Sequence, residues 1–173
     1  MSEFEDLRAA VRDVPDFPRA GILFRDVGPL LADPRLFARS IAALAAPFVG
    51  SGITHVAAVE SRGFIFGAPL ALALNAALVL IRKPGKLPAA AWHVEYALEY
   101  GTDALEMHRD ACHAGARVLI VDDVMATGGT ARAARELVER SGAAVVAVSV
   151  LIELTALRGR DAVGATTMSV LRY

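Results

Sequence analysis

Apolar and polar positions alternate along this chain in a pattern typical of strands and helices that follow one another. Compact apolar runs, typical of buried strands, lie at 55–59, 77–81, 117–121, 143–151 and 165–171. Apolar residues recur at helical spacing over 3–12, 34–48, 63–74 and 130–140. Strands that alternate with helices and short loops predict an α/β fold with a parallel doubly wound sheet flanked by helices.

Capping and turn residues set the limits of these elements. Asp33 and Pro34 combine an N-cap acceptor with a proline at the first helical position, so a helix should begin there. The Pro- and Gly-rich segment 15–21 cannot form a regular helix. Residues 92–108 carry alternating polar and apolar positions, which indicate a hairpin or a mobile flap.

One uncharged stretch, from Phe64 to Ile81, reaches the lower length limit of a membrane span. Gly67, Pro69 and Asn75 interrupt it, and Asn75 lies where a helix would end and a strand would begin. We therefore interpret the stretch as a buried helix followed by a buried strand, and we expect a soluble protein.

Composition and charge add mainly exclusions. The 173 residues suit one domain. The 18 Lys and Arg residues nearly balance 19 Asp and Glu, without the basic excess of proteins that bind nucleic acid or membrane surfaces. Cys112 is the only cysteine, so an intrachain disulfide is impossible, and the acidic N-terminus has no apolar core. These features predict a cytoplasmic protein.

The segment with the clearest chemistry follows the apolar run 118–121. Asp122 and Asp123 come directly after that strand, and the turn 127–130, Thr-Gly-Gly-Thr, leads into a helix. Glycines let the backbone fold tightly and present its N–H groups, and a helix N-terminus attracts an anion. The segment is neither a Walker P-loop nor G-x-G-x-x-G. It predicts a cradle for a phosphate monoester beside carboxylates that suit sugar hydroxyls or hydrated Mg²⁺; the alternative is a turn whose threonines only cap the helix.

Cationic residues follow the other strands at the same expected edge of the sheet. Ligands of doubly wound sheets bind beyond the carboxyl ends of the strands, so the residues after Val59, Ile81 and Val121 should line the site. Arg62, after the first strand, can chelate a diphosphate; its alternative is a surface salt bridge. The loop after the second strand, which could also be a solvated charge run, holds Arg82, Lys83 and Lys86.

At this point the chain resembles a known family. Residues 118–130 resemble the signature of the type I phosphoribosyltransferases, which bind phosphoribosyl pyrophosphate (PRPP). Four further blocks resemble the adenine-specific members in the same order: 17–27, 60–67, 82–88 and 98–103. The resemblance implies a single domain, 1–173, with an N-terminal hood over about 1–33 and a flexible catalytic loop over about 89–107. It further implies purine salvage: the 5-phosphoribosyl group passes from PRPP to adenine, giving AMP and pyrophosphate, with Mg²⁺ and in a homodimer.

The resemblance also assigns roles to residues. Glu99 would handle the proton at adenine N7, and Tyr100 would shield the reaction. PRPP would contact Arg62, Asp122, Asp123, Ala126, Thr127, Gly128, Gly129 and Thr130. The pyrophosphate would meet Arg62, Arg82, Lys83 and Lys86. Adenine would lie against Leu23, Phe24 and Arg25. Mg²⁺ is expected to keep water and substrate oxygens, with no direct protein ligand. The peptide between Ser61 and Arg62 should be strained, because the corresponding bond is often cis in the family.

Residues 89–96, which include Trp92 and His93, depart from the small and hydroxylated residues usual in the family and put the closed geometry of the loop in doubt. Two other functions stay open. A 6-oxopurine phosphoribosyltransferase is one, although such enzymes lack the hood residues Phe24 and Arg25. A non-catalytic PRPP-binding regulator of transcription is the other, although the chain shows no helix-turn-helix and no basic excess.

Overall fold

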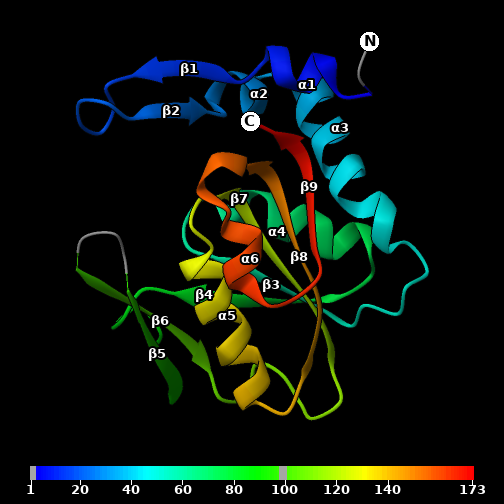
Figure 1. The fold of residues 1–173 in the computed structure, drawn as a ribbon. Helices are drawn as coiled ribbons and strands as arrows, with labels where there is room; N and C mark the ends of the chain where they lie inside the picture. Colours follow the sequence, from blue (N-terminus) through cyan, green and yellow to red (C-terminus); the bar gives the residue numbers. More distant parts are fainter. Residues whose placement is uncertain (1–2, 98–100) are drawn as a thin grey trace.

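The protein is built around a mixed sheet whose strands follow the order β5-β6-β4-β3-β7-β8-β9 (Figure 1). The computed structural model describes residues 3–97 and 101–173. Neighbours in the central part pair in parallel, from β4 through to β9, whereas β6 pairs antiparallel with both β4 and β5. The strands are β3 (His55–Val59), β4 (Ala77–Arg82), β5 (Ala91–Ala97), β6 (Thr102–His108), β7 (Arg117–Met125), β8 (Ala144–Glu153) and β9 (Thr167–Arg172).

Helices cover both faces of this sheet, as the α/β pattern predicts. One face carries α3 (Pro34–Ala45), the 3-10 turn η1 (Ala46–Phe48) and α4 (Gly63–Ala73), and the other carries α5 (Gly129–Arg140). Strand β7 shows why its apolar run is continuous: Val118 and Ile120 pack in the core under α5, whereas Leu119 and Val121 pack under α3 and α4.

The stretch from Phe64 to Ile81 forms a helix, α4, followed by a strand, β4, as predicted. The strand is not fully buried, because Leu78 and Leu80 are 42% and 40% exposed. Pro69 lies inside α4, and Gly67 lets the helix approach β3, because a Cβ there would lie only 2.4 Å from the Cβ of Ala58. Within the described residues, no helix is long and apolar enough to cross a membrane.

The N-terminal region forms a small layer of its own beyond the main sheet (Figure 1). It comprises α1 (Glu5–Ala9), the antiparallel strands β1 (Arg12–Pro15) and β2 (Leu23–Asp26), and α2 (Gly28–Ala32). The Pro- and Gly-rich segment forms the connection between β1 and β2, and it contains a cis peptide between Phe17 and Pro18.

Residues 91–108 form the antiparallel hairpin of β5 and β6, which was one of the two predicted alternatives for this region. Trp92 lies in β5 and packs against the core, with the guanidinium of Arg109 4.5 Å from the centre of its ring. Trp92 thus lies in a strand of the hairpin and not in an irregular loop, and it is partly buried because the hairpin packs against α5.

The connection from β8 to β9 consists of the 3-10 turn η2 (Thr155–Leu157) and the short helix α6 (Gly159–Val163). Leu154 donates its N–H to the carbonyl of Met125 at 2.9 Å, and Tyr173 donates its N–H to the carbonyl of Glu153 at 2.9 Å. These bonds tie the connection and the end of the chain to the same edge of the sheet.

Candidate active site

A cavity of about 450 Å³ opens at the carboxyl ends of β3, β4 and β7. This position agrees with the prediction that the residues after Val59, Ile81 and Val121 line the site. The residues that line it are Glu60, Ser61, Arg62, Lys83, Tyr96, Asp103, Asp122, Asp123, Val124 and Thr130.

Asp122 and Asp123 lie within β7 rather than after it. The strand continues to Met125 because β8 pairs with it along this length, with Asp122 opposite Val150. The carboxylate of Asp122 accepts the backbone N–H of Asp123 at 2.8 Å. Burial, and secondarily the neighbouring Asp123 carboxylate, raise the pKa of Asp122 well above its ordinary value. Two adjacent acids therefore share one wall of the cavity.

Arg62 supplies the positive charge that faces this pair. Its Nε donates to the carboxylate of Asp123, which is only 4% exposed, so the contact is more than a surface salt bridge. The peptide between Ser61 and Arg62, where the family resemblance implied a cis bond, is not cis in this structure. The cis bond lies one residue earlier, between Glu60 and Ser61, and Arg62 has helical backbone angles at the start of α4.

The predicted phosphate cradle lies beside the cavity. Ala126, Thr127, Gly128, Gly129 and Thr130 line a second hollow of about 90 Å³, and Thr130 belongs to both hollows. Gly128 has φ +82°, a left-handed conformation that favours glycine, and α5 begins at the next residue. The hollow thus has the turn and the helix N-terminus that an anion site requires.

A polar network that sequence reasoning missed connects the hairpin to this cradle. Lys83 Nζ pairs with the carboxylate of Asp103, and the hydroxyl of Tyr96 donates to the same carboxylate at 3.1 Å. Thr130 donates to the Tyr96 hydroxyl at 3.3 Å. Tyr96 and Asp103 are opposite each other in the β5–β6 pair, so the register of the hairpin brings them together. The alternation of polar and apolar residues over 92–108 was the sequence feature that could have indicated this hairpin.

Arg82 and Lys86 are not brought to the cavity wall in this structure. Arg82 donates to Glu60 at 3.1 Å and to the carbonyl of Lys86 at 3.2 Å. Glu60 also accepts the backbone N–H of Lys83 at 2.9 Å, and these contacts help to lower its pKa against the opposing effect of burial. Arg82 and Glu60 thus hold the shape of the cationic loop, and Lys83 is the residue that it presents to the cavity.

Phe24 is the hood residue that lies next to Arg62. The guanidinium of Arg62 is 5.5 Å from the centre of the Phe24 ring, and Phe24 meets Phe17 edge-on at 5.2 Å. Phe24 and Phe17 line a hollow of about 290 Å³ with Val14 and Asp26. Leu23 is 45% exposed.

Arg25, the third hood residue of the expected set, does not point to the same hollow. Its guanidinium pairs with Asp13 and lies 4.1 Å from the centre of the Tyr173 ring. Of the three predicted hood residues, Phe24 is thus the one whose side chain lies beside Arg62, the cation that faces Asp123.

Glu99 and Tyr100, the predicted catalytic residues, lie outside the described residues. Their neighbours along the chain are described: Ala97 ends β5 and pairs with Thr102. A Cβ on Gly129 would lie 3.3 Å from the Tyr96 ring and 3.4 Å from the carbonyl of Ala97. The strand that leads to Glu99 therefore ends against the start of α5.

Comparison with known proteins agrees with this geometry. Residues 30–170 match the model of the phosphoribosyl transferase domain. Adenine phosphoribosyltransferase of Myxococcus xanthus is 54% identical over 166 residues, covering 96% of this chain and 90% of the relative. That of Methylococcus capsulatus is also 54% identical, covering 98% and 99%.

Solved structures show the same likeness. The enzyme from Rhodothermus marinus superposes with a TM-score of 0.94 at 50% identity, covering 98% of each chain. The adenine phosphoribosyltransferase of Saccharomyces cerevisiae, complexed with an imino-altritol bisphosphate and adenine, superposes with a TM-score of 0.93 at 40% identity, covering 96% and 97%. The family model covers residues 30–170, and the relatives match nearly the whole chain, so the chain belongs to the phosphoribosyl transferase domain family.

Proposed function

We propose that the protein transfers the 5-phosphoribosyl group of PRPP to adenine and releases AMP and pyrophosphate, a reaction of purine salvage. The observation that carries the proposal is the cavity, which brings Asp122, Asp123, Arg62 and Lys83 together beside the glycine turn 126–130. Relatives that share 54% identity over nearly the whole chain and are named for this activity support the choice of adenine.

In this proposal the 5′-phosphate of PRPP lies in the cradle 126–130. Backbone N–H groups and the hydroxyls of Thr127 and Thr130 are its donors, and the N-terminus of α5 favours its charge. The ribose then extends towards Asp122 and Asp123, whose carboxyl oxygens can accept hydrogen bonds from its hydroxyls.

The diphosphate would lie between Arg62 and Lys83. Each of these cations already has a carboxylate partner: Arg62 pairs with Asp123, and Lys83 pairs with Asp103. A diphosphate that binds here would replace these carboxylates as the anionic partner of the two cations. A guanidinium can bind two phosphate oxygens at once, and an ammonium can turn towards a third. As the diphosphate leaves, these cations stabilise its growing charge. Arg82 and Lys86 remain part of the proposed pyrophosphate set, through the loop that positions Lys83.

The donor set of the cavity fits Mg²⁺ in the form that PRPP would bring. Within the described part of the chain, no cluster of three or more His, Cys, Asp or Glu side chains could form a metal cage. Asp122 and Asp123, which line the cavity, would be the carboxylates nearest to a hydrated ion that arrives with the substrate. When bound, the ion supplies charge neutralisation of the diphosphate.

Adenine would stack on Phe24 with its edge read by the backbone of Leu23 and Arg25. Its N9 forms the new bond to C1′ as the bond from C1′ to the diphosphate oxygen breaks, with oxocarbenium character at C1′. The nucleobase must give up one proton, and Glu99 is proposed to accept it at N7. Tyr100 is proposed to shield the reacting centre from water, which would otherwise hydrolyse PRPP.

A homodimer is part of the proposal. Ile65 and Leu72 of α4 are 39% and 83% exposed, and Leu78 and Leu80 of β4 are 42% and 40% exposed. Burial of such an apolar face against a second copy is favourable. We expect Leu78→Asp to shift the protein from dimer to monomer in sedimentation velocity; an unchanged dimer would remove this face from consideration. A cytoplasmic location is also proposed, because the only cysteine, Cys112, is a free, buried thiol.

The proposed function is tested by supplying PRPP and Mg²⁺ with adenine, hypoxanthine, guanine or xanthine in separate reactions. AMP from adenine alone supports it, and Glu99→Gln is the matched variant that should bind PRPP yet turn over slowly. If a nucleotide forms from a 6-oxopurine instead, the hood binds that base and the protein is a 6-oxopurine phosphoribosyltransferase. PRPP binding without any nucleotide product would support the regulator of transcription instead.

A further inference from the structure

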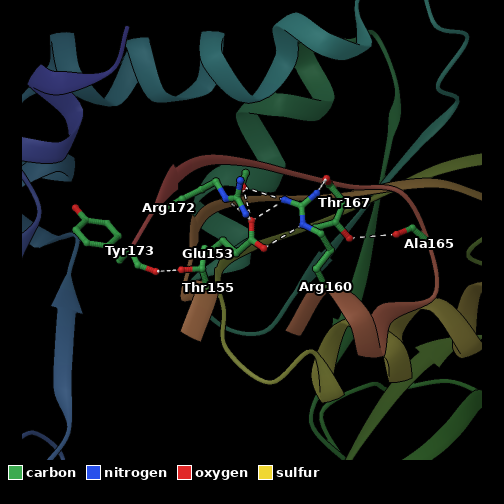
Figure 2. Close-up of polar contacts among 8 residues, drawn as sticks. Glu153, Thr155, Arg160, Ala165, Thr167, Arg172 and Tyr173 are labelled. Carbon is green, nitrogen blue, oxygen red and sulfur yellow. Dashed lines mark hydrogen bonds and ion pairs between the residues drawn. The ribbon is translucent and has the colours of Figure 1, made fainter. Parts of the chain in front are cut away.

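A buried ionic junction around Glu153 joins the end of β8 to α6 and β9 (Figure 2). Glu153, the last residue of β8, is only 3% exposed, although its side chain carries a carboxyl group. Arg160 of α6 donates to both of its oxygens, from Nε at 3.0 Å and from Nη2 at 2.6 Å. Ser169 donates to Glu153 at 2.6 Å, and Arg172 Nε lies 3.5 Å from the same oxygen. Both carboxylate oxygens are therefore satisfied by a fixed set of donors.

Arg160 is held on its far side as well. Its Nη1 donates to the carbonyl of Thr167 at 2.5 Å, and Nη2 lies 3.3 Å from the Ser169 hydroxyl. Figure 2 shows the guanidinium between Glu153 and Thr167, so that one side chain joins α6 to β8 and to β9. A planar fork with this many fixed partners leaves the start of α6 little freedom to move.

The residue before Arg160 touches the cradle directly. A Cβ on Gly159 would lie 2.2 Å from the carbonyl oxygen of Ala126, and a Cβ on Gly128 would lie 2.2 Å from the carbonyl oxygen of Gly159. The two backbones are therefore in contact with no side chain between them. If Gly159 moves towards the turn, residues 126–128 must move with it, and if it moves away, the turn loses the backbone on which it packs.

We propose that Glu153 and Arg160 are positioning residues that hold the phosphate loop 126–130 in its binding geometry through the backbone of Gly159. This inference rests on the proposed function, because it takes the ligand of the loop to be the 5′-phosphate of PRPP. Neither side chain lines the cavity or the cradle, so both act through the backbone. Their loss loosens the donors for one phosphate and leaves the hood and the adenine hollow unchanged.

Arg160→Gln tests this role, and Arg158→Gln is its matched control. Arg158 lies on the same turn, its side chain is 82% exposed, and its ion pair is with Asp161 of the same turn. We expect Arg160→Gln to raise the KM for PRPP about tenfold, as loss of one hydrogen bond to a charged group would. The KM for adenine and the kcat should stay within about twofold of the wild-type values, because the substitution acts on the binding of PRPP. Arg160→Lys, which keeps the charge but loses the fork, should lie between the two.

Titration calorimetry with PRPP, and separately with ribose 5-phosphate, measures the loop without any base. Both Kd values should rise about tenfold in Arg160→Gln and stay unchanged in Arg158→Gln. Unchanged Kd and KM values for PRPP, or equal rises for PRPP and adenine, would overturn the positioning role even if the melting temperature falls. If Arg160→Gln does not fold, Arg160→Lys decides by the same criteria. Wild-type protein that binds PRPP but makes no AMP would refute the proposed function alone.

Discussion

Replacement of Gly128 by alanine is the sharpest perturbation that the structure offers. Gly128 has φ +82°, and a Cβ there would lie 2.2 Å from the carbonyl oxygen of Gly159, more than 1 Å inside the 3.4 Å at which ordinary contact begins. Because the obstacle is backbone held by the Glu153 junction, the loop itself must shift by about 1 Å. A misplacement of about 1 Å can cost about 10²-fold in rate.

Gly115 provides a control with the same backbone conformation. It also has φ +82°, but a Cβ there meets nothing within 4 Å. Gly115→Ala should therefore show only the cost of a left-handed alanine, about 1 kcal/mol, or about 2–4 °C in melting temperature. Any effect of Gly128→Ala beyond this control reports the contact with Gly159.

Steady-state kinetics with varied PRPP, together with thermal unfolding of both variants, is the assay. We expect Gly128→Ala to lower kcat/KM for PRPP about 100-fold, equivalent to about 2.7 kcal/mol, and Gly115→Ala to leave it within about twofold. If the two variants share one kcat/KM and one melting temperature, the loop does not depend on its close contact with α6, and the reasoning fails.

Three further outcomes follow from the same structure. Phe24→Ala should raise the KM for adenine about tenfold through loss of base stacking, with the Kd for PRPP unchanged; an unchanged KM would remove Phe24 from the base site. Glu99→Gln should lower kcat by about 10²–10⁴ without weakening PRPP binding, measured by rapid quench and calorimetry; retention of full kcat would rule it out as the proton acceptor. Hydrogen bonds, chiefly from Arg160, lower the pKa of Glu153. The ionised carboxylate of Glu153 therefore stabilises the folded protein above the ordinary pKa of 4.5, and this stabilisation is lost as the pH falls through the folded-state pKa. Glu153→Gln should thus be about 2 kcal/mol less stable at pH 7 but approach the wild type in acid, as urea unfolding at several pH values would show; an equal deficit at pH 3 would contradict this.

The edge of the sheet that carries the site could be predicted from local pattern. The runs that end at Val59, Ile81 and Val121 are continuous and apolar, a pattern typical of strands in a parallel sheet. The first and third are buried on both faces, whereas Leu78 and Leu80 of the second are exposed. Parallel strands bring their carboxyl ends to one edge, so Arg62, Lys83 and the two acids had to converge. The glycine turn and the start of α5 followed from the same local chemistry.

What could not be predicted depends on pairing between distant segments. The register of β5 and β6 sets Tyr96 opposite Asp103, and the contact of the hairpin with α5 buries Trp92. Alternation along a strand indicates which residues share a face, but not which neighbour the strand chooses. The length of β7 beyond Val121 likewise depends on its partner β8.

The Glu153 junction shows the same limit more strongly. Its members come from the end of β8, from α6 and from β9, and no short motif connects them. A glutamate at the end of an apolar run looks like a solvated strand end until β9 and α6 cover it.

The central claim is the transfer of phosphoribose to adenine, and a competition between nucleobases tests it most directly. One reaction would contain PRPP, Mg²⁺ and equal concentrations of adenine, hypoxanthine, guanine and xanthine, with every nucleotide product separated and measured. We expect AMP as the product, with one pyrophosphate released for each AMP formed. A mixture dominated by another nucleotide, or pyrophosphate release without AMP, would contradict it.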